Sequence, residues 1–153
     1  MILSIDPGNS ESAYVILNDD MTPADFGKIP NDEMLNIINN LAGQIKQVAI
    51  EMIASYGMAV GKEVFETCVW IGRFYESAIR NNAKVSYIYR KDVKINLCGS
   101  MKAKDSNIRQ ALIDRFGVVG TKNNKGYFYG FKADIWSAYA VGITYLDKGG
   151  KDE

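Results

Sequence analysis

The chain has 153 residues, of which 47% are hydrophobic and 24% charged, as expected for an ordinary globular protein of one domain. No apolar run reaches the roughly 18–20 residues that span a bilayer, and no charged and then apolar leader opens the chain. We therefore expect neither a membrane protein nor a secreted one.

Histidine is absent, and Cys68 and Cys98 are the only cysteines. The absence of histidine excludes Ser-His-Asp and Cys-His catalysis and metal sites that need an imidazole. Two cysteines are too few for a zinc cluster or a disulfide framework. We expect a cytoplasmic protein, whose catalysis would depend on carboxylates, lysines, hydroxyls and hard metal ions.

The 18 basic and 18 acidic residues cancel overall but are unevenly distributed. Residues 1–83 have a net charge of −6, residues 84–125 have +7, and the remainder has −1. This distribution would suit a metal-dependent phosphodiester enzyme, in which acidic residues bind metal cations and basic residues bind the phosphates of the substrate. Chance patterning on a solvated surface is the alternative.

Apolar periodicity and turn residues predict an α/β domain over residues 1–153, with a five-stranded mixed sheet flanked by helices. Three strands form an antiparallel meander, and later strands alternate with helices. The predicted elements are strands 1–5, 12–17 and 24–29, a helix 30–41, a strand 47–53, a helix 63–81, a strand 84–89, short helices 91–98 and 105–116, a loop 121–130 and a helix 133–146.

Three acids occupy unusual positions: Asp6 ends an apolar strand, Glu51 lies inside one, and Asp134 begins the last helix. Burying a lone charge costs several kcal/mol, so such acids are usually paired, protonated or bound to cations. Asp6 could instead cap a turn, Glu51 could pair with Lys or Arg, and Asp134 could simply be a first-turn acid that the helix dipole favours. If the three converge, they form a ligand set for Mg²⁺ or Mn²⁺.

Three segments carry a family resemblance: Ile5-Asp6-Pro7-Gly8, Ala49-Ile50-Glu51 and Lys132-Ala133-Asp134-Ile135-Trp136-Ser137-Ala138. In this order they resemble the RuvC branch of the RNase H-like nuclease superfamily, the Holliday junction resolvases, and particularly the compact versions carried by bacteriophages. The resemblance spans nearly the whole chain. It implies an RNase H-like fold in which two parallel strands join the meander, and a location in the host cytoplasm if a phage encodes the protein.

The resemblance further implies a homodimeric endonuclease of DNA recombination and repair that cuts four-way junctions and other branched DNA with Mg²⁺, for which Mn²⁺ substitutes. In that scheme Asp6 bridges two metal ions about 3.5–4 Å apart, while Glu51 and Asp134 complete their coordination. No histidine base is needed, in agreement with the composition.

The sequence departs from the family pattern at two positions. A fourth ligand usually precedes the last acid by three residues, where this chain has Phe131. Asp105 could replace it, but Asp105 at the start of a helix is more simply an N-cap. The family also places a stacking aromatic three residues after the strand glutamate. Ala54 stands there, so Tyr56 is the candidate for DNA stacking, with a plain loop tyrosine as the alternative.

The basic segment supplies the predicted DNA contacts. Its run Ser100-Met101-Lys102-Ala103-Lys104-Asp105 resembles the family's lysine-bearing stretch beside the active site, which implies Lys104 as first choice and Lys102 as second choice for a contact to the scissile phosphate. Ordinary solvated lysines are the alternative. No base-reading motif is visible, so we expect recognition of DNA shape and backbone. The predicted contacts are Arg90, Lys91, Lys94, Lys102, Lys104 and Arg109.

The helix at 63–81 is apolar on more than one face, which is typical of a helix buried on two sides. We expect one side to pack on the sheet and the other, through Phe65, Trp70 and Phe74, to form the interface of a two-fold symmetric homodimer. Burial within one chain is the alternative.

Other functions fit parts of the pattern. A nuclease of RNA–DNA hybrids or of branched DNA in general would use the same acids, and a catalytically weakened junction-binding protein would explain the missing fourth ligand. The segment Asp6-Pro7-Gly8-Asn9-Ser10 also resembles the phosphate-binding opening of sugar kinases and actin-like ATPases, but those proteins need a second such domain, for which this chain is too short.

Overall fold

The computed structural model, which describes residues 1–149, is built around a five-stranded mixed sheet with strand order β3-β2-β1-β4-β5. β1 pairs antiparallel with β2 and β2 antiparallel with β3, whereas β4 runs parallel to both β1 and β5. The elements are β1 (Ile2–Asp6), β2 (Glu11–Leu17), β3 (Pro23–Pro30), α1 (Asn31–Asn40), β4 (Gln47–Met52), α2 (Lys62–Arg80), β5 (Lys84–Tyr89), α3 (Arg90–Cys98), α4 (Asp105–Phe116) and α5 (Asp134–Asp147).

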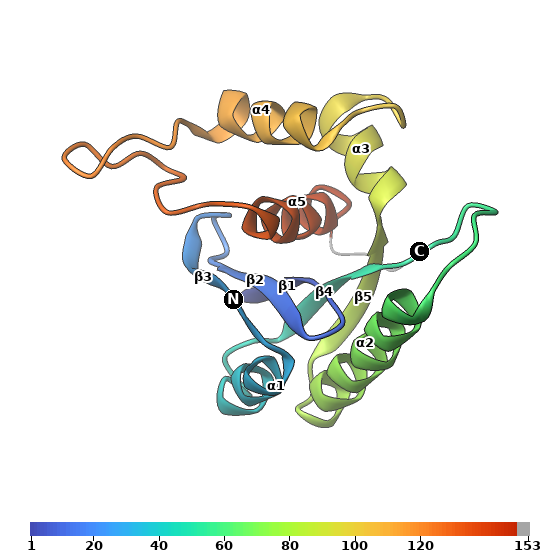
Figure 1. Cartoon of the computed structure of the whole chain (residues 1–153). Helices are drawn as coiled ribbons and strands as arrows, with labels where there is room; N and C mark the ends of the chain where they lie inside the picture. The colour runs from blue at the N-terminus through green and yellow to red at the C-terminus, as the bar shows by residue number, and fades with distance from the viewer. Residues whose placement is uncertain (150–153) are drawn as a thin grey trace.

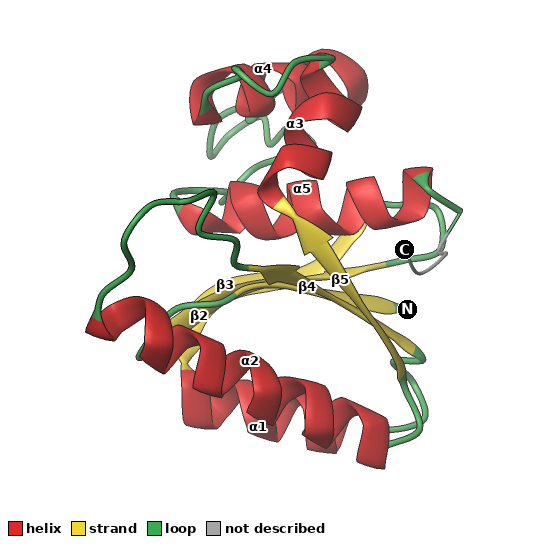
Figure 2. Cartoon of the chain, turned by 90° about the vertical axis from the view of Figure 1, so that its right-hand side faces the viewer, coloured by secondary structure: helices red, strands yellow, loops and turns green. Residues whose placement is uncertain are grey.

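Helices cover both faces of the sheet. Helices α1 and α2 lie on one face and α5 on the other, with α3 and α4 beyond α5 (Figure 1). Figure 2 shows the same layers from the side. Because β1 is the central strand, its interior residues Leu3 and Ile5 are fully buried. The mixed α/β sheet predicted from the sequence is therefore confirmed.

Strand alternation decides which side chains face which helices. Leu3 and Ile5 belong to the core beneath α1 and α2, whereas Ile2 belongs to the core beneath α5. On β4, Ile50 likewise faces α1 and α2, and Ala49 faces α5. Because side chains alternate along each strand, Asp6 faces the opposite side from Ile5 and Glu51 the opposite side from Ile50, so both acids point toward α5.

Helix α5 is buried along almost its whole length and packs directly on β1 and β2. Gly142 permits this approach, because a Cβ there would lie 2.9 Å from both Leu17 Cδ1 and Ser4 Oγ. Close packing fixes the start of α5 relative to the strand ends, and this start carries Asp134.

Predicted element boundaries agree with the structure to within one or two residues at each end. Within residues 1–149, no helix has the length and apolar character needed to cross a membrane.

Candidate active site

The three acids singled out from the sequence lie together at one edge of the sheet. Ile5 pairs with Ile50, so Asp6 and Glu51 follow at the next positions of neighbouring strands, and Asp134 is the first residue of α5 above them. Burial, followed by the charges of Glu51 and Asp134, raises the pKa of Asp6 to about 8. The predicted convergence of these carboxylates is therefore present in the fold, whereas their catalytic role remains a prediction.

Two basic side chains accompany these acids. Lys28 Nζ on β3 donates a hydrogen bond to Asp134 Oδ2 at 2.8 Å. One guanidinium nitrogen of Arg90 lies 3.6 Å from Glu51 Oε1, and another pairs with Asp105. The ion pair considered as an alternative for Glu51 is thus realised. Arg90, predicted as a DNA contact, lies between two carboxylates.

Glu51 has a buried oxygen that the protein leaves unsatisfied. Its Oε1 accepts no hydrogen bond from the described residues, although the side chain is only 17% exposed. Burial raises the pKa of Glu51, and the neighbouring Arg90 charge opposes that rise. A buried carboxylate oxygen that has a cation 3.6 Å away but accepts no hydrogen bond is only partly satisfied, and it is a suitable ligand for a hard cation.

The acids do not form a finished metal cluster. Across residues 1–149, no three Cys, Asp or Glu side chains are close enough together to hold a metal ion as they stand. Lys28 holds Asp134, and Arg90 lies beside Glu51. A metal ion bound by all three acids therefore requires side-chain rearrangement, while the donor chemistry itself fits Mg²⁺ or Mn²⁺.

Asp134 lies between two cavities. The larger, about 330 Å³, is lined by Asp6, Lys28, Asp134, Ala13 and the turn at residues 7–11. The smaller, about 140 Å³, lies toward α3 and α4 and is bordered by Arg90, Asp105 and Arg109. Asp134 thus lines both cavities, Asp6 lines only the larger one, and Glu51 lines neither.

A hydrogen-bond network fixes the turn that follows Asp6. Ser12 Oγ donates to Asn31 Oδ1 at 2.6 Å and accepts from the Gly8 N–H at 3.1 Å. Asn31 Nδ2 donates to the Gly8 carbonyl at 3.0 Å. Gly8 is required here, because a Cβ would lie 2.2 Å from the Glu11 carbonyl oxygen. The turn therefore holds the end of β1 in a defined position.

The residue before Asp134 is conformationally strained. Ala133 has φ +46° and ψ −127° at the N-terminus of α5. Sparsely populated backbone conformations of this kind cost about 1–3 kcal/mol and concentrate at functional sites. The strain lies directly beside the candidate carboxylates.

A buried aromatic occupies the usual position of the fourth ligand, and Asp105, the one replacement considered, is paired with Arg90. Phe131 is only 7% exposed, and its ring packs 4.6 Å from that of Phe26. The sequence predicted Asp105 as the N-cap of α4, but the N-cap is Lys104, whose backbone N–H donates to Asn107 Oδ1. Asp105 is the first helical residue and pairs with Arg90 because the start of α4 faces the start of α3.

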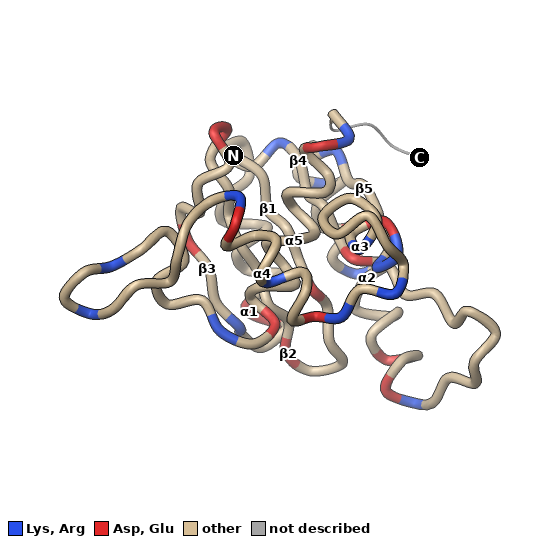
Figure 3. Tube along the Cα trace, turned by 90° about the horizontal axis from the view of Figure 1, so that it is seen from above, with Lys and Arg blue, Asp and Glu red and all other residues tan. Residues whose placement is uncertain are grey.

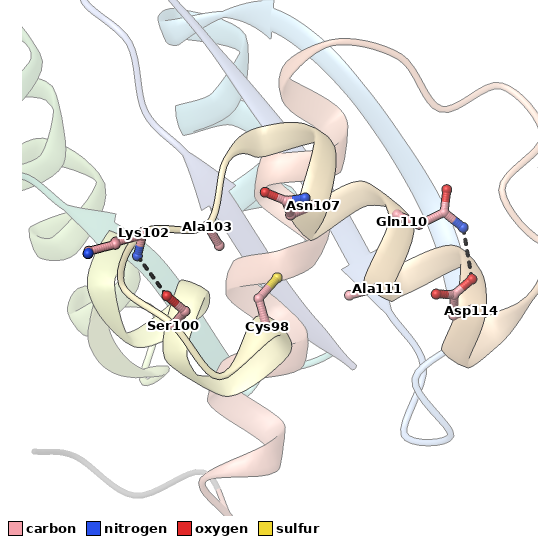
Figure 4. A pocket seen from close by; sticks show the side chains of 8 residues that line it. All are labelled: Cys98, Ser100, Lys102, Ala103, Asn107, Gln110, Ala111 and Asp114. Atoms are coloured by element: carbon pink, nitrogen blue, oxygen red, sulfur yellow. Dashed lines mark hydrogen bonds between the residues drawn. The ribbon is translucent and has the colours of Figure 1, made fainter.

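In the part of the chain that the structure describes, no ion pair joins the other predicted DNA-contact residues to Asp6, Glu51 or Asp134. Lys91, Lys102, Lys104 and Arg109 are exposed, and Lys94 is half-buried. Lys102 lines a pocket of about 450 Å³ between α3 and α4, lined by none of the three acids (Figure 4). Their DNA contacts remain predictions, for which Arg109 is the best placed because it borders the cavity beside Asp134.

The predicted stacking and dimer residues differ in exposure. Tyr56 is 58% exposed in the loop between β4 and α2, and Phe65 on α2 is 61% exposed. Trp70 is half-buried, with the Arg73 guanidinium 4.1 Å from its ring centroid. Phe74 is fully buried in the core of its own chain, so its assignment to a dimer interface was wrong.

Sequence reasoning missed Lys28. Asp6 pairs with Ala13 and Ala13 with Lys28, so these residues form one row across β1, β2 and β3. Only this register could have identified Lys28, because 22 positions separate it from Asp6 in the sequence.

Solved structures share this arrangement of elements. RuvC of Thermus thermophilus matches with a TM-score of 0.68 and 16% identity, covering 97% of this chain and 96% of that one. T. thermophilus RuvC in complex with a Holliday junction substrate matches with a TM-score of 0.71 and 14% identity, covering 97% and 93%. No protein-family model and no curated protein matches the sequence. The chain therefore has the RuvC fold along nearly its entire length.

Proposed function

We propose that the protein is a divalent-metal-dependent DNA endonuclease that resolves Holliday junctions and other branched DNA. The observation that carries the proposal is the grouping of Asp6, Glu51 and Asp134 at one sheet edge, with one buried Glu51 oxygen unsatisfied. Support also comes from the fold, because a RuvC with the same architecture has been solved with a Holliday junction substrate.

Mg²⁺ is the proposed cofactor, with Mn²⁺ as a substitute. Asp6, Glu51 and Asp134 would hold it through carboxylate oxygens, which hard cations prefer. When bound, such ions activate an attacking water and stabilise the leaving oxygen of a phosphodiester. The proposal includes two such ions, which Asp6, Glu51 and Asp134 would hold between them.

The chain's own side chains would perform the remaining tasks. Lys28 and Arg90 pair with Asp134 and Glu51 when no metal ion is bound, and both would be free to bind a phosphate once a metal ion takes their place. Arg109, Lys104 and Lys102 would bind the DNA backbone beside the site. No base-reading contact is needed for a junction recognised by its shape.

A homodimer would suit a substrate with two equivalent strands to cut. Helix α2 offers Phe65, 61% exposed, and Val69, 63% exposed, one turn apart on a surface that no part of the described chain covers. We propose this patch, without Phe74, as the dimer interface. Phe65→Glu and Val69→Glu should convert a dimer to a monomer in light scattering, whereas a monomeric wild type would contradict the assignment.

Cleavage assays test the activity. Labelled four-way junction, linear duplex and RNA–DNA hybrid should be incubated with the protein in Mg²⁺ or EDTA. We expect cutting of the junction in Mg²⁺ alone and no cutting by Asp6→Asn, which should still bind. Wild-type cleavage by Asp6→Asn would contradict the proposal, and cutting of hybrids alone would favour an RNase H activity.

A junction-binding protein with weakened catalysis is the second candidate. The observation that favours it is the buried Phe131 at the usual position of the fourth ligand. Tight, metal-independent junction binding without cleavage in Mg²⁺ or Mn²⁺ would support this function over the nuclease.

A further inference from the structure

A basic hairpin projects from the protein between α4 and α5. We call residues 118–126 the α4–α5 hairpin. Its two arms are joined by hydrogen bonds from the Gly126 N–H to the Val119 carbonyl and between the backbones of Thr121 and Asn124. The hairpin extends well beyond the helices and the sheet (Figure 1).

Glycines keep the two arms close together. Gly120 has φ +77°, and a Cβ there would lie 2.3 Å from the Gly126 nitrogen. A Cβ on Gly126 would lie 2.1 Å from the Val118 carbonyl oxygen. The hairpin is therefore a narrow, defined projection, since any larger residue at either position would separate its arms.

The base of the hairpin is anchored in the body that carries the acids. The hydroxyls of Tyr127 and Tyr139 lie 2.8 Å apart, and both donate to the Met21 carbonyl. The ring of Phe128, the next residue, is fully buried. The chain then passes over Phe26 on β3 and reaches Asp134. The hairpin is thus attached rigidly to the edge that forms the candidate active site.

The tip has the chemistry of a nucleic-acid contact. Residues 121–125 read Thr-Lys-Asn-Asn-Lys, and all five are exposed. Residues 116–133 contain Lys122, Lys125 and Lys132 but no acid. Figure 3 shows basic and no acidic positions on this projection. Lysines and small polar side chains bind phosphate and sugar oxygens, and no nearby carboxylate on the hairpin repels a polyanion.

We propose that the α4–α5 hairpin is a second DNA-binding element, which grips the phosphate backbone of a junction arm away from the scissile bond. This inference rests on the proposed function, because it takes branched DNA as the ligand. Lys122 and Lys125 supply the charge, while the glycine-narrowed arms and the aromatic base hold it at a fixed position.

The salt dependence of junction binding tests the hairpin directly. Binding of a fluorescent four-way junction should be measured in Ca²⁺ from 50 to 300 mM salt for wild type and for Lys122→Gln/Lys125→Gln. Each lost phosphate contact reduces the slope of log K against log salt by about 0.9. We expect the double variant to lose nearly two units of slope and at least about tenfold in affinity at the lowest salt.

Two further variants control for net charge and for folding. Lys46→Gln/Arg80→Gln removes the same charge from the residue before β4 and from the last residue of α2, at the end of the sheet away from Glu51. This control should retain the wild-type slope. Lys122→Arg/Lys125→Arg should also retain it, because the charge is conserved. Equal slopes for wild type and the hairpin Gln variant, or equal losses in the Lys46/Arg80 control, would overturn the hairpin's role.

The same assay separates this inference from the proposed nuclease. A wild type that binds the junction but never cuts it would contradict the nuclease, while the slopes would still decide the hairpin. A wild type that binds no DNA of any kind would overturn both.

Discussion

Asp6 should make the stability of the protein strongly dependent on pH when no metal ion is available. Burial and the charges of Glu51 and Asp134 raise its pKa from 3.8 to about 8 in the folded protein. Between these values the native state retains a proton that the unfolded chain has released. The free energy of unfolding should therefore fall as the pH rises, and the stabilisation is lost as the pH passes through the folded pKa.

The size of the effect follows from the shift. One pKa unit corresponds to about 1.4 kcal/mol, so the loss from pH 5 to pH 8 reaches at most about 4 kcal/mol. Glu51, whose pKa is also raised, adds to the decline in the same direction. Asp6→Asn has nearly the same shape but cannot ionise, so most of the decline should disappear in this variant.

Urea unfolding followed by circular dichroism at pH 5, 6, 7 and 8 in EDTA measures this directly. Asp32→Asn, which removes an exposed acid from the first turn of α1, is the matched control and should keep the wild-type pH dependence. Saturating Mg²⁺ should stabilise the wild type more at pH 8 than at pH 5, because a metal ion replaces the proton. Parallel profiles for wild type and Asp6→Asn would refute the coupling of these carboxylates.

Three other substitutions test the site and its surroundings. Lys28→Met removes the cation hydrogen-bonded to Asp134, whose exposed ion pair is worth about 0.2–1 kcal/mol; calorimetry should show Mn²⁺ binding tightened up to about fivefold, and weaker binding would contradict a competing role for Lys28. Ala133→Gly should raise the free energy of unfolding by about 1 kcal/mol, because glycine adopts the positive φ without strain; a lower unfolding midpoint would show that Ala133 is unstrained. Phe74→Ala should lower that free energy by about 3–5 kcal/mol with no change in the dimer dissociation constant, and selective loss of the dimer would restore Phe74 to the interface.

Much of the fold was predictable because the apolar residues of this chain follow clear strand and helix periodicities, and Gly, Pro, Asn and Asp residues mark its turns. The buried run at Val48–Ile50 predicted a central strand, and the apolar α5 predicted a helix packed on the sheet. Alternation along β1 and β4 then places Asp6 and Glu51 on the same side. The grouping of the acids could thus be predicted from local pattern and sheet geometry alone.

The sequence-based predictions failed where tertiary contacts determine which residues are buried or paired. Phe74 shares the buried stripe of α2 with Thr67, Ile71 and Ala78, whereas Phe65 lies on another face, and composition alone could not say which face meets the sheet. The ion pair of Lys28 with Asp134 depends on the register of three strands. No local sequence signal contains that register.

The central claim is that Asp6, Glu51 and Asp134 together bind divalent metal, and anomalous diffraction from crystals grown with Mn²⁺ tests it most directly. We predict an anomalous peak in contact with carboxylate oxygens of all three residues, with Lys28 displaced from Asp134. Crystals that show no peak among these acids, with the Lys28–Asp134 bond intact at saturating Mn²⁺, would contradict the claim.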